Sequence, residues 1–109
     1  MSEEPGSVLE VLEQARKLLV EVGWTQHAFA RNSRGHILES NDPTAVCYCA
    51  LGAVFYISPS GSPLAGAAYK RLNAVIDGRD IVRWNDSPER KKEDVLEVYD
   101  KAIAQEMLP

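Results

Sequence analysis

Residues 43–58 read PTAVCYCALGAVFYIS, and this stretch decides the fold. It contains no charged residue, although 26% of the 109-residue sequence is charged, and it holds both cysteines of the chain. The preceding Asp42-Pro43 pair is typical of a helix start, because aspartate caps free N–H groups and proline fits the first helical turn. We therefore predict a helix over 43–57. Since apolar residues surround it on every side, it should be a buried central helix.

Three further helices are predicted around the central one. A capping box over residues 7–10, followed by apolar residues at spacings of three and four, predicts a first helix that ends near Gly23. Serine–proline pairs at 62–63 and 87–88 repeat the start signal of the central helix. We accordingly predict these three helices over 8–22, 63–77 and 88–106.

The segment after the first helix has a different pattern. Residues 24–40 show no helical stripe and centre on the turn sequence Asn-Ser-Arg-Gly at 32–35. This pattern predicts a small β-hairpin that pairs about 25–31 with 36–40 and lies against the helices. The expected fold is α+β, mainly α, with about four helices and one hairpin.

Length and charge limit the domain organisation and the partners. A chain of 109 residues with 45% hydrophobic residues is typical of one domain with its own core. We expect a disordered lead-in over 1–6 and a single globular domain over 7–109. The net charge of −4 argues against nucleic-acid binding, which needs a basic surface.

The sequence favours a cytoplasmic location. The N-terminal MSEEPGS has no hydrophobic core of a secretory signal, and the longest apolar run is too short to cross a bilayer. Two cysteines without an export signal are typical of reduced thiols in a cytoplasm. We expect no membrane association, and a monomer or weak homodimer.

The cysteines do not indicate a metal site. On a helix, Cys47 and Cys49 point about 200° apart, so they cannot share one ion. In a hairpin that pairs Arg31 with His36, the second histidine, His27, lies about 13 Å from the first. We therefore expect no metal and no cofactor.

A catalytic thiol is the alternative interpretation. Cys49 or Cys47 with His27 or His36 as the base, and Asp86 as an orienting group, would make a thiol-dependent hydrolase or a small-ligand-binding protein. However, Cys49 lies about two turns into the predicted helix, beyond the first turn where the helix dipole stabilises a thiolate. Cysteine is also commonly buried as a small hydrophobic residue. Core packing is the favoured interpretation.

Two motifs resemble a known family. CALGAV at 49–54 and WNDSPER with its following helix at 84–103 resemble a small bacterial and phage family of unknown function, with a Cys-Ala-x-Gly-Ala helix and a Trp-Asn-Asp motif. The resemblance extends from about Val8 to Ala104, and Tyr48 stands where the family pattern has tryptophan. It implies a shared fold and no particular activity.

Five residues are candidate ligand- or partner-binding residues. Trp84, Asn85 and Asp86 precede the last helix, whose free N–H groups attract polar groups. A core tryptophan beside an Asx turn is the favoured interpretation, because Asp86 would itself repel an anion. Trp24 and His27 could line a pocket, or Trp24 could cover the hairpin with its indole N–H on a backbone carbonyl.

No catalytic motif is present in the sequence. There is no phosphate-binding glycine loop, no HExxH and no nucleophile elbow. The basic stretches at 31–36 and 90–92 are interpreted as solvated surface. We predict a non-catalytic binding or interaction module with an unknown protein partner. A DNA-binding helix pair fits the helices but not the charge.

Overall fold

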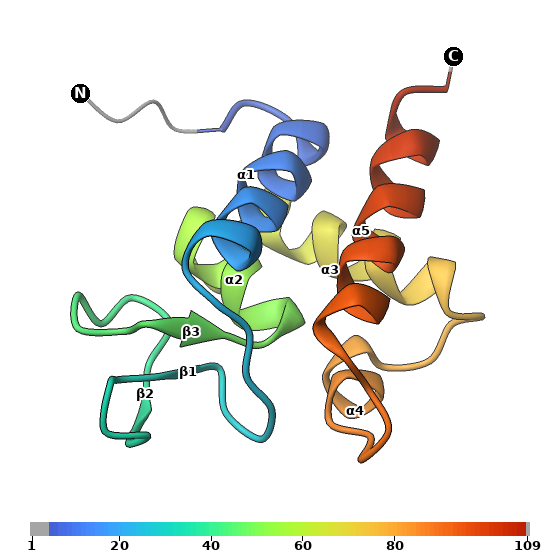
Figure 1. The fold of residues 1–109 in the computed structure, drawn as a ribbon. Helices are drawn as coiled ribbons and strands as arrows, with labels where there is room; N and C mark the ends of the chain where they lie inside the picture. The colour runs from blue at the N-terminus through green and yellow to red at the C-terminus, as the bar shows by residue number, and fades with distance from the viewer. Residues whose placement is uncertain (1–4, 109) are drawn as a thin grey trace.

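The structure is a computed structural model and describes residues 5–108. In this part of the chain it has five helices and three short strands, so the predicted α+β, mainly helical class is confirmed (Figure 1). The predicted lead-in over 1–6 lies mostly outside the described residues. The elements in chain order are α1 (Val8–Glu21), β1 (Ala30–Arg31), β2 (Ile37–Leu38), β3 (Cys47–Tyr48), α2 (Ala50–Ile57), α3 (Pro63–Val75), α4 (Ile81–Asn85) and α5 (Lys92–Glu106).

Helices α1 and α3 begin where the sequence predicts. The hydroxyl of Ser7 accepts a hydrogen bond from the N–H of Glu10 at 3.2 Å, and Ser62 caps α3 in the same way through the N–H of Ala65 at 3.2 Å. Helix α3 ends two residues before its predicted end, because Asp77 adopts a positive φ of 62°.

The other two predicted proline starts are wrong. The N–H of Ala45 donates to the carbonyl of Asp42 at 3.2 Å, and the N–H of Arg90 donates to the carbonyl of Ser87 at 3.0 Å. Each bond spans three residues, so each proline takes the second position of a β-turn and starts no helix. Helix α5 therefore begins at Lys92 instead of residue 88.

Only the second half of the predicted central helix over 43–57 is helical, and a two-residue strand precedes it. The N–H groups of Val46 and Cys49 donate to the carbonyls of Arg31 and Phe29, at 2.8 and 3.1 Å. These bonds join 47–48 to the sheet as β3, and α2 starts only at Ala50. The central position is confirmed, because the first five residues of α2 are all buried.

The sheet has the order β2-β1-β3 and is antiparallel throughout. Arg31 pairs with Ile37, one residue beyond the predicted partner His36. The predicted first strand over 25–31 is confirmed only at its last two residues. The segment before it makes the polar contacts described below.

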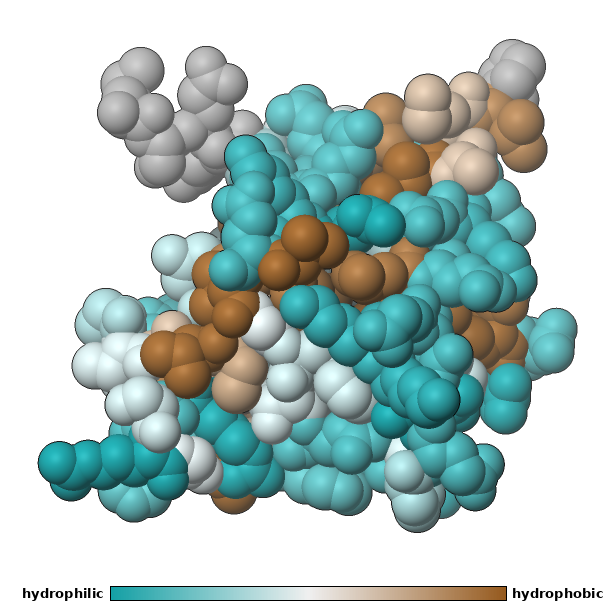
Figure 2. All heavy atoms as spheres, in the orientation of Figure 1, coloured by the Kyte–Doolittle hydropathy of each residue, from teal (hydrophilic) through white to brown (hydrophobic). Residues whose placement is uncertain are grey.

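The core lies between α2 and the longer helices. Helix α1 packs against α2, α3 and α5, and the sheet lies below α1 and α2 in Figure 1. Figure 2 shows hydrophobic residues exposed among the hydrophilic ones over α1 and α5, and again near the sheet. The largest fully buried hydrophobic side chains are Tyr99, Leu12, Leu19, Leu72, Ile81 and Val11.

Helix α4 lies between the predicted helices over 63–77 and 88–106. Asp80 caps it by accepting from the N–H of Val82 at 2.8 Å, and Asn73 of α3 accepts from the N–H of Ile81 at 2.8 Å. Side-chain oxygens from two places therefore hold a helix of only five residues. Its last residue, Asn85, is the centre of the candidate site.

The chain has the dimensions of one domain. Its radius of gyration is 12.8 Å, close to the value of about 13 Å expected for one domain of this length. In the described part of the chain, none of the helices combines the length and the hydrophobicity that a membrane crossing needs.

Candidate functional site

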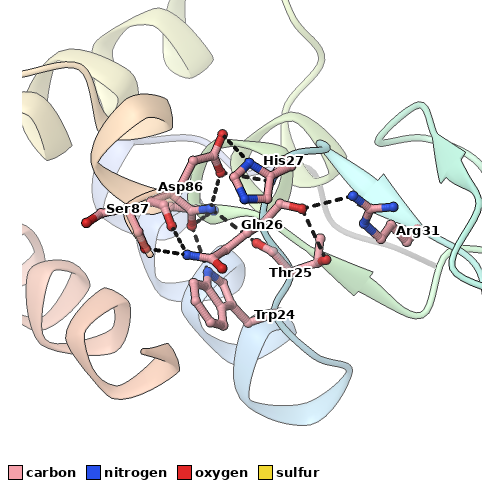
Figure 3. Close-up of polar contacts among 9 residues, drawn as sticks. Trp24, Thr25, Gln26, His27, Arg31, Asp86 and Ser87 are labelled. Atoms are coloured by element: carbon pink, nitrogen blue, oxygen red, sulfur yellow. Dashed lines mark hydrogen bonds and ion pairs between the residues drawn. The ribbon is translucent and has the colours of Figure 1, made fainter. Parts of the chain in front are cut away.

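A cluster of hydrogen-bonded side chains joins the segment after α1 to the end of α4 (Figure 3). We call it the polar cluster. Its two halves, one after α1 and one at the end of α4, are about 60 residues apart in sequence. The second half also bonds to the first turn of α2. The polar cluster consists of Trp24, Thr25, Gln26, His27, Asn85, Asp86 and Ser87.

Asn85 is the centre of the polar cluster and is 0% exposed. Its Oδ1 accepts from the indole Nε1–H of Trp24 at 2.7 Å and from the backbone N–H of Ala50 at 2.9 Å. Its Nδ2 donates to the carbonyl of Thr25 at 3.1 Å and to Oδ1 of Asp86 at 3.0 Å. These four bonds use the full capacity of the amide, so Asn85 joins three segments inside the protein.

Asp86 and Gln26 extend the polar cluster toward solvent. Oδ1 of Asp86 accepts from the backbone N–H of His27 at 2.9 Å, and Nδ1 of the His27 ring lies 3.8 Å from Oδ2. Nε2 of Gln26 donates to the carbonyls of Asn85 and Ser87 at 2.9 and 2.7 Å. These bonds stabilise His27 at its positive φ of 65°, which is uncommon for a residue other than glycine.

The start of α2 is held from two sides. Asn85 accepts from the N–H of Ala50, and the phenol of Tyr99 in α5 donates to the Ala50 carbonyl at 2.6 Å. Burial raises the pKa of Tyr99 well above its usual value, so the phenol stays protonated as this donor. Both α4 and α5 are thereby tied to the same residue of the central helix.

The structure brings four of the five predicted site residues together. Trp24, His27, Asn85 and Asp86 are all members of the polar cluster. The indole N–H of Trp24 meets a side-chain oxygen instead of the predicted backbone carbonyl. Trp84 makes different contacts: the guanidinium carbon of Arg90 lies 3.7 Å from the centroid of its ring.

Cys49 occupies a different position from the predicted one. It is the N-cap of α2, and its sulfur accepts from the N–H of Gly52 at 3.2 Å. The side chain is buried, with only 2% of the residue exposed, and burial raises the thiol pKa. The N-terminal position alone would favour a thiolate, but desolvation is the larger effect here, so the thiol stays protonated.

Cys47 lies on β3 and is half-buried, with its sulfur 3.9 Å from the carbonyl of Arg31. Neither cysteine has a hydrogen bond to a histidine within residues 5–108. In the same residues no three His, Cys, Asp or Glu side chains come close enough together to hold a metal ion. The thiol-dependent alternative needs a histidine base bonded to a cysteine sulfur, and the described residues do not form such a pair.

Thiol labelling tests this arrangement of Cys49. In a Cys47→Ser variant, which leaves Cys49 alone, we expect an aromatic disulfide to react at least about 100-fold more slowly with native protein than with protein in urea. The native rate should stay low between pH 6 and 8, because burial raises the pKa of this thiol. Rapid native reaction below pH 7 would show a stabilised thiolate and contradict the buried state. Cys49→Ser, which leaves Cys47 alone, is the matched comparison.

An open hollow of about 770 Å³ lies beside the sheet, between β2 and the end of α2. We call it the apolar groove. The rings of Phe29 and Phe55 meet edge to face on its wall, with centroids 5.5 Å apart. Glu39 is its one charged lining residue within the described chain. The apolar groove is lined by Phe29, Ile37, Leu38, Phe55, Tyr56 and Pro59, with polar Glu39, Ser40, Asn41 and Ser60.

Sequence reasoning missed the apolar groove and Gln26. The groove residues come from β2, α2 and the segments before and after them, so no single stretch of sequence carries the pattern. Gln26 lies beside two predicted site residues, but its role depends on carbonyls about 60 residues away.

The fold and the polar cluster define a small, mainly helical α+β domain whose central helix is clamped by a buried asparagine. The chain belongs to a family of unknown function, DUF6197, whose model matches residues 3–105. The expected membership in a family without an assigned activity is thereby confirmed. No curated protein and no solved structure matches the chain.

Proposed function

We propose that the protein is a non-catalytic interaction domain that binds an extended, apolar segment of a partner protein in the apolar groove. The observation that carries the proposal is a group of exposed aromatic and aliphatic side chains around one hollow. Phe29, Ile37 and Tyr56 are all exposed and all line it. Aromatic residues gathered at one surface site are typical of protein-binding surfaces.

The free edge of β2 supports an extended occupant. The N–H of Asn32 donates to the carbonyl of His36, and paired residues alternate along an antiparallel ladder. The N–H and C=O groups of Ile37 consequently face away from β1, while its side chain is 67% exposed. An added strand would pair with these groups and place alternate side chains in the groove.

Charge narrows the chemistry of the partner segment. Glu39 lies in the groove and the whole chain carries a net charge of −4. A segment with apolar or aromatic residues and a neighbouring lysine or arginine complements this surface, whereas an acidic one is repelled.

A cytoplasmic location is part of the proposal, as is the bacterial or phage origin that the family resemblance implies. Cys47 and Cys49 are both unpaired, which supports a reducing compartment. The net negative charge supports a protein partner over nucleic acid.

A displayed library of randomised extended peptides tests the groove. We expect the selected peptides to combine apolar or aromatic residues with a basic one, and to bind saturably when synthesised. Ile37→Ser and Tyr56→Ser should each weaken binding about tenfold or more, because each removes a large contact from the groove. Isothermal titration calorimetry measures the affinities, and the amide spectrum should change at residues 37–41 and 55–56.

Val20→Ser is the matched control. Val20 on α1 is 46% exposed and Tyr56 is 47% exposed, but only Tyr56 lines the groove. Equal losses in both variants, or a library that yields no saturable binder, would overturn the proposal. Sedimentation of the free protein covers a different occupant: a dimer that Ile37→Ser dissociates would assign the groove to a second copy of this chain.

A further inference from the structure

A second hollow, of about 510 Å³, lies on the side of α4 away from the polar cluster's centre and shares no lining residue with the apolar groove. Asp80, Arg83, Trp84 and Ser87 follow one another at spacings of three, one and three, so they lie on one face of α4 and its extension. Arg79 and Arg90 complete the lining from the two ends. We call this hollow the arginine pocket.

Backbone carbonyls orient two of its three guanidinium groups through hydrogen bonds to Nε. Nε of Arg79 donates to the carbonyl of Ile76 at 3.1 Å, and Nε of Arg90 donates to the carbonyl of Trp84 at 2.8 Å while its guanidinium lies over the Trp84 ring. Within residues 5–108 the terminal nitrogens of both arginines have no hydrogen-bond partner. They are oriented donors without an acceptor.

The charge of the arginine pocket is opposite to that of the chain. Arg79, Arg83 and Arg90 face one lining carboxylate, Asp80, which already accepts from the N–H of Val82. In the described part of the chain no carboxylate oxygen lies within 4.0 Å of any of the three guanidinium groups. Three charges concentrated without ion pairs, in a chain of net charge −4, attract an anion of more than one charge.

We propose that the arginine pocket binds the phosphate group of a small phosphate monoester. A dianionic phosphate offers several acceptor oxygens to the free nitrogens of Arg79 and Arg90, in the paired geometry that guanidinium groups favour. Arg83, which is exposed and has no partner within residues 5–108, closes on the same group. The volume accommodates a small molecule beyond the phosphate itself.

Nitrogen-15 spectra of the whole chain test the site directly, since its two tryptophans give two indole signals. A Trp84→Phe variant identifies the Trp84 signal. We expect sodium phosphate and phenyl phosphate to shift it saturably at a constant ionic strength of about 150 mM, where weak surface attraction is screened. Phenyl phosphate should bind at least as tightly as inorganic phosphate. An absent or non-saturating shift with both probes would overturn the proposal.

The matched variants are Arg83→Gln and Arg34→Gln. Both remove one positive charge, but Arg34 lies in the exposed turn between β1 and β2, outside the pocket. Arg83→Gln should weaken phenyl phosphate binding about tenfold, as expected for a lost charge-assisted hydrogen bond, while Arg34→Gln leaves it unchanged within about twofold. Equal losses of affinity in the two variants would show that the effect comes from net charge alone, and would overturn the proposed site.

Vesicles that contain phosphatidic acid, a lipid phosphate monoester, distinguish the source of the phosphate. We expect no retention of the protein on them at the same ionic strength. Retention that Arg83→Gln abolishes, with no response to phenyl phosphate, would overturn the small-molecule ligand in favour of a membrane surface. Because the apolar groove shares no residue with this pocket, failure of either proposal leaves the other standing.

Discussion

An Asn85→Ala variant should lose about 4 kcal/mol of unfolding free energy, a large fraction of what a domain of this size has. The substitution removes the acceptor of two N–H groups, the Trp24 indole and the Ala50 backbone, and the donor to the Thr25 carbonyl. Each buried polar group left without a partner costs about 1–3 kcal/mol. Urea unfolding followed by circular dichroism measures the loss.

Asn32→Ala is the control for this variant. Oδ1 of Asn32 also accepts from two backbone N–H groups, those of Arg34 and His36, but these bonds lie in an exposed turn. Water replaces the lost acceptor there, so we expect a loss of about 1 kcal/mol or less. If the two asparagine variants lose equal stability, the polar cluster does not hold α4 against α2.

A Gly52→Ala variant is expected to lose about 3 kcal/mol, the upper part of the range for overpacking a core. Gly52 lies in the first turn of α2, directly against the carbonyl of Phe29, the residue before β1. A Cβ at this position would lie 2.0 Å from that oxygen and 2.8 Å from its carbon, distances that real Cβ atoms do not reach. The oxygen accepts from the N–H of Cys49, so β1 cannot move away without breaking its bond to the helix start. Denaturant unfolding gives the loss.

Gly66→Ala gives the opposite result and serves as the control. Gly66 is an exposed residue inside α3, and a Cβ there meets no atom within 4 Å apart from the adjoining residues and backbone of its own helix. Alanine favours a helix over glycine by about 1 kcal/mol, so this variant should gain roughly that amount. A Gly52→Ala variant as stable as the parent protein would contradict the close contact between α2 and β1.

The helices that could be predicted are those whose starts depend on neighbouring residues. Ser7 and Ser62 lie within three residues of the N–H groups that they cap, so the sequence alone contains the signal. Asp42-Pro43 carries the same signal and starts a turn, because the backbone that follows donates to the carbonyls of Arg31 in β1 and of Phe29 directly before it. A bond to a distant carbonyl leaves no mark on the local sequence.

The candidate site was predictable in its residue types and not in its arrangement. Trp24, His27, Asn85 and Asp86 could be selected because polar and aromatic residues near turns often have specific partners. Their bonds to each other could not be predicted. Trp24 and Asn85, for example, are 61 residues apart in sequence, and only folding brings them together. The arginine pocket was hidden for a similar reason, since Arg79 and Arg90 are brought together by α4.

The bond between Asn85 and Ala50 also bears on the order in which the chain assembles. The first turn of α2 contains no side-chain oxygen of its own for the Ala50 N–H and takes one from a residue 35 positions later. On a ribosome, the N-terminal half of the domain is synthesised before that oxygen exists. The start of helix α2 therefore lacks this bond until α4 has emerged, whereas the strand pairs beside it need only residues that precede α2. Helix α1, which is capped by its own Ser7, can form before then.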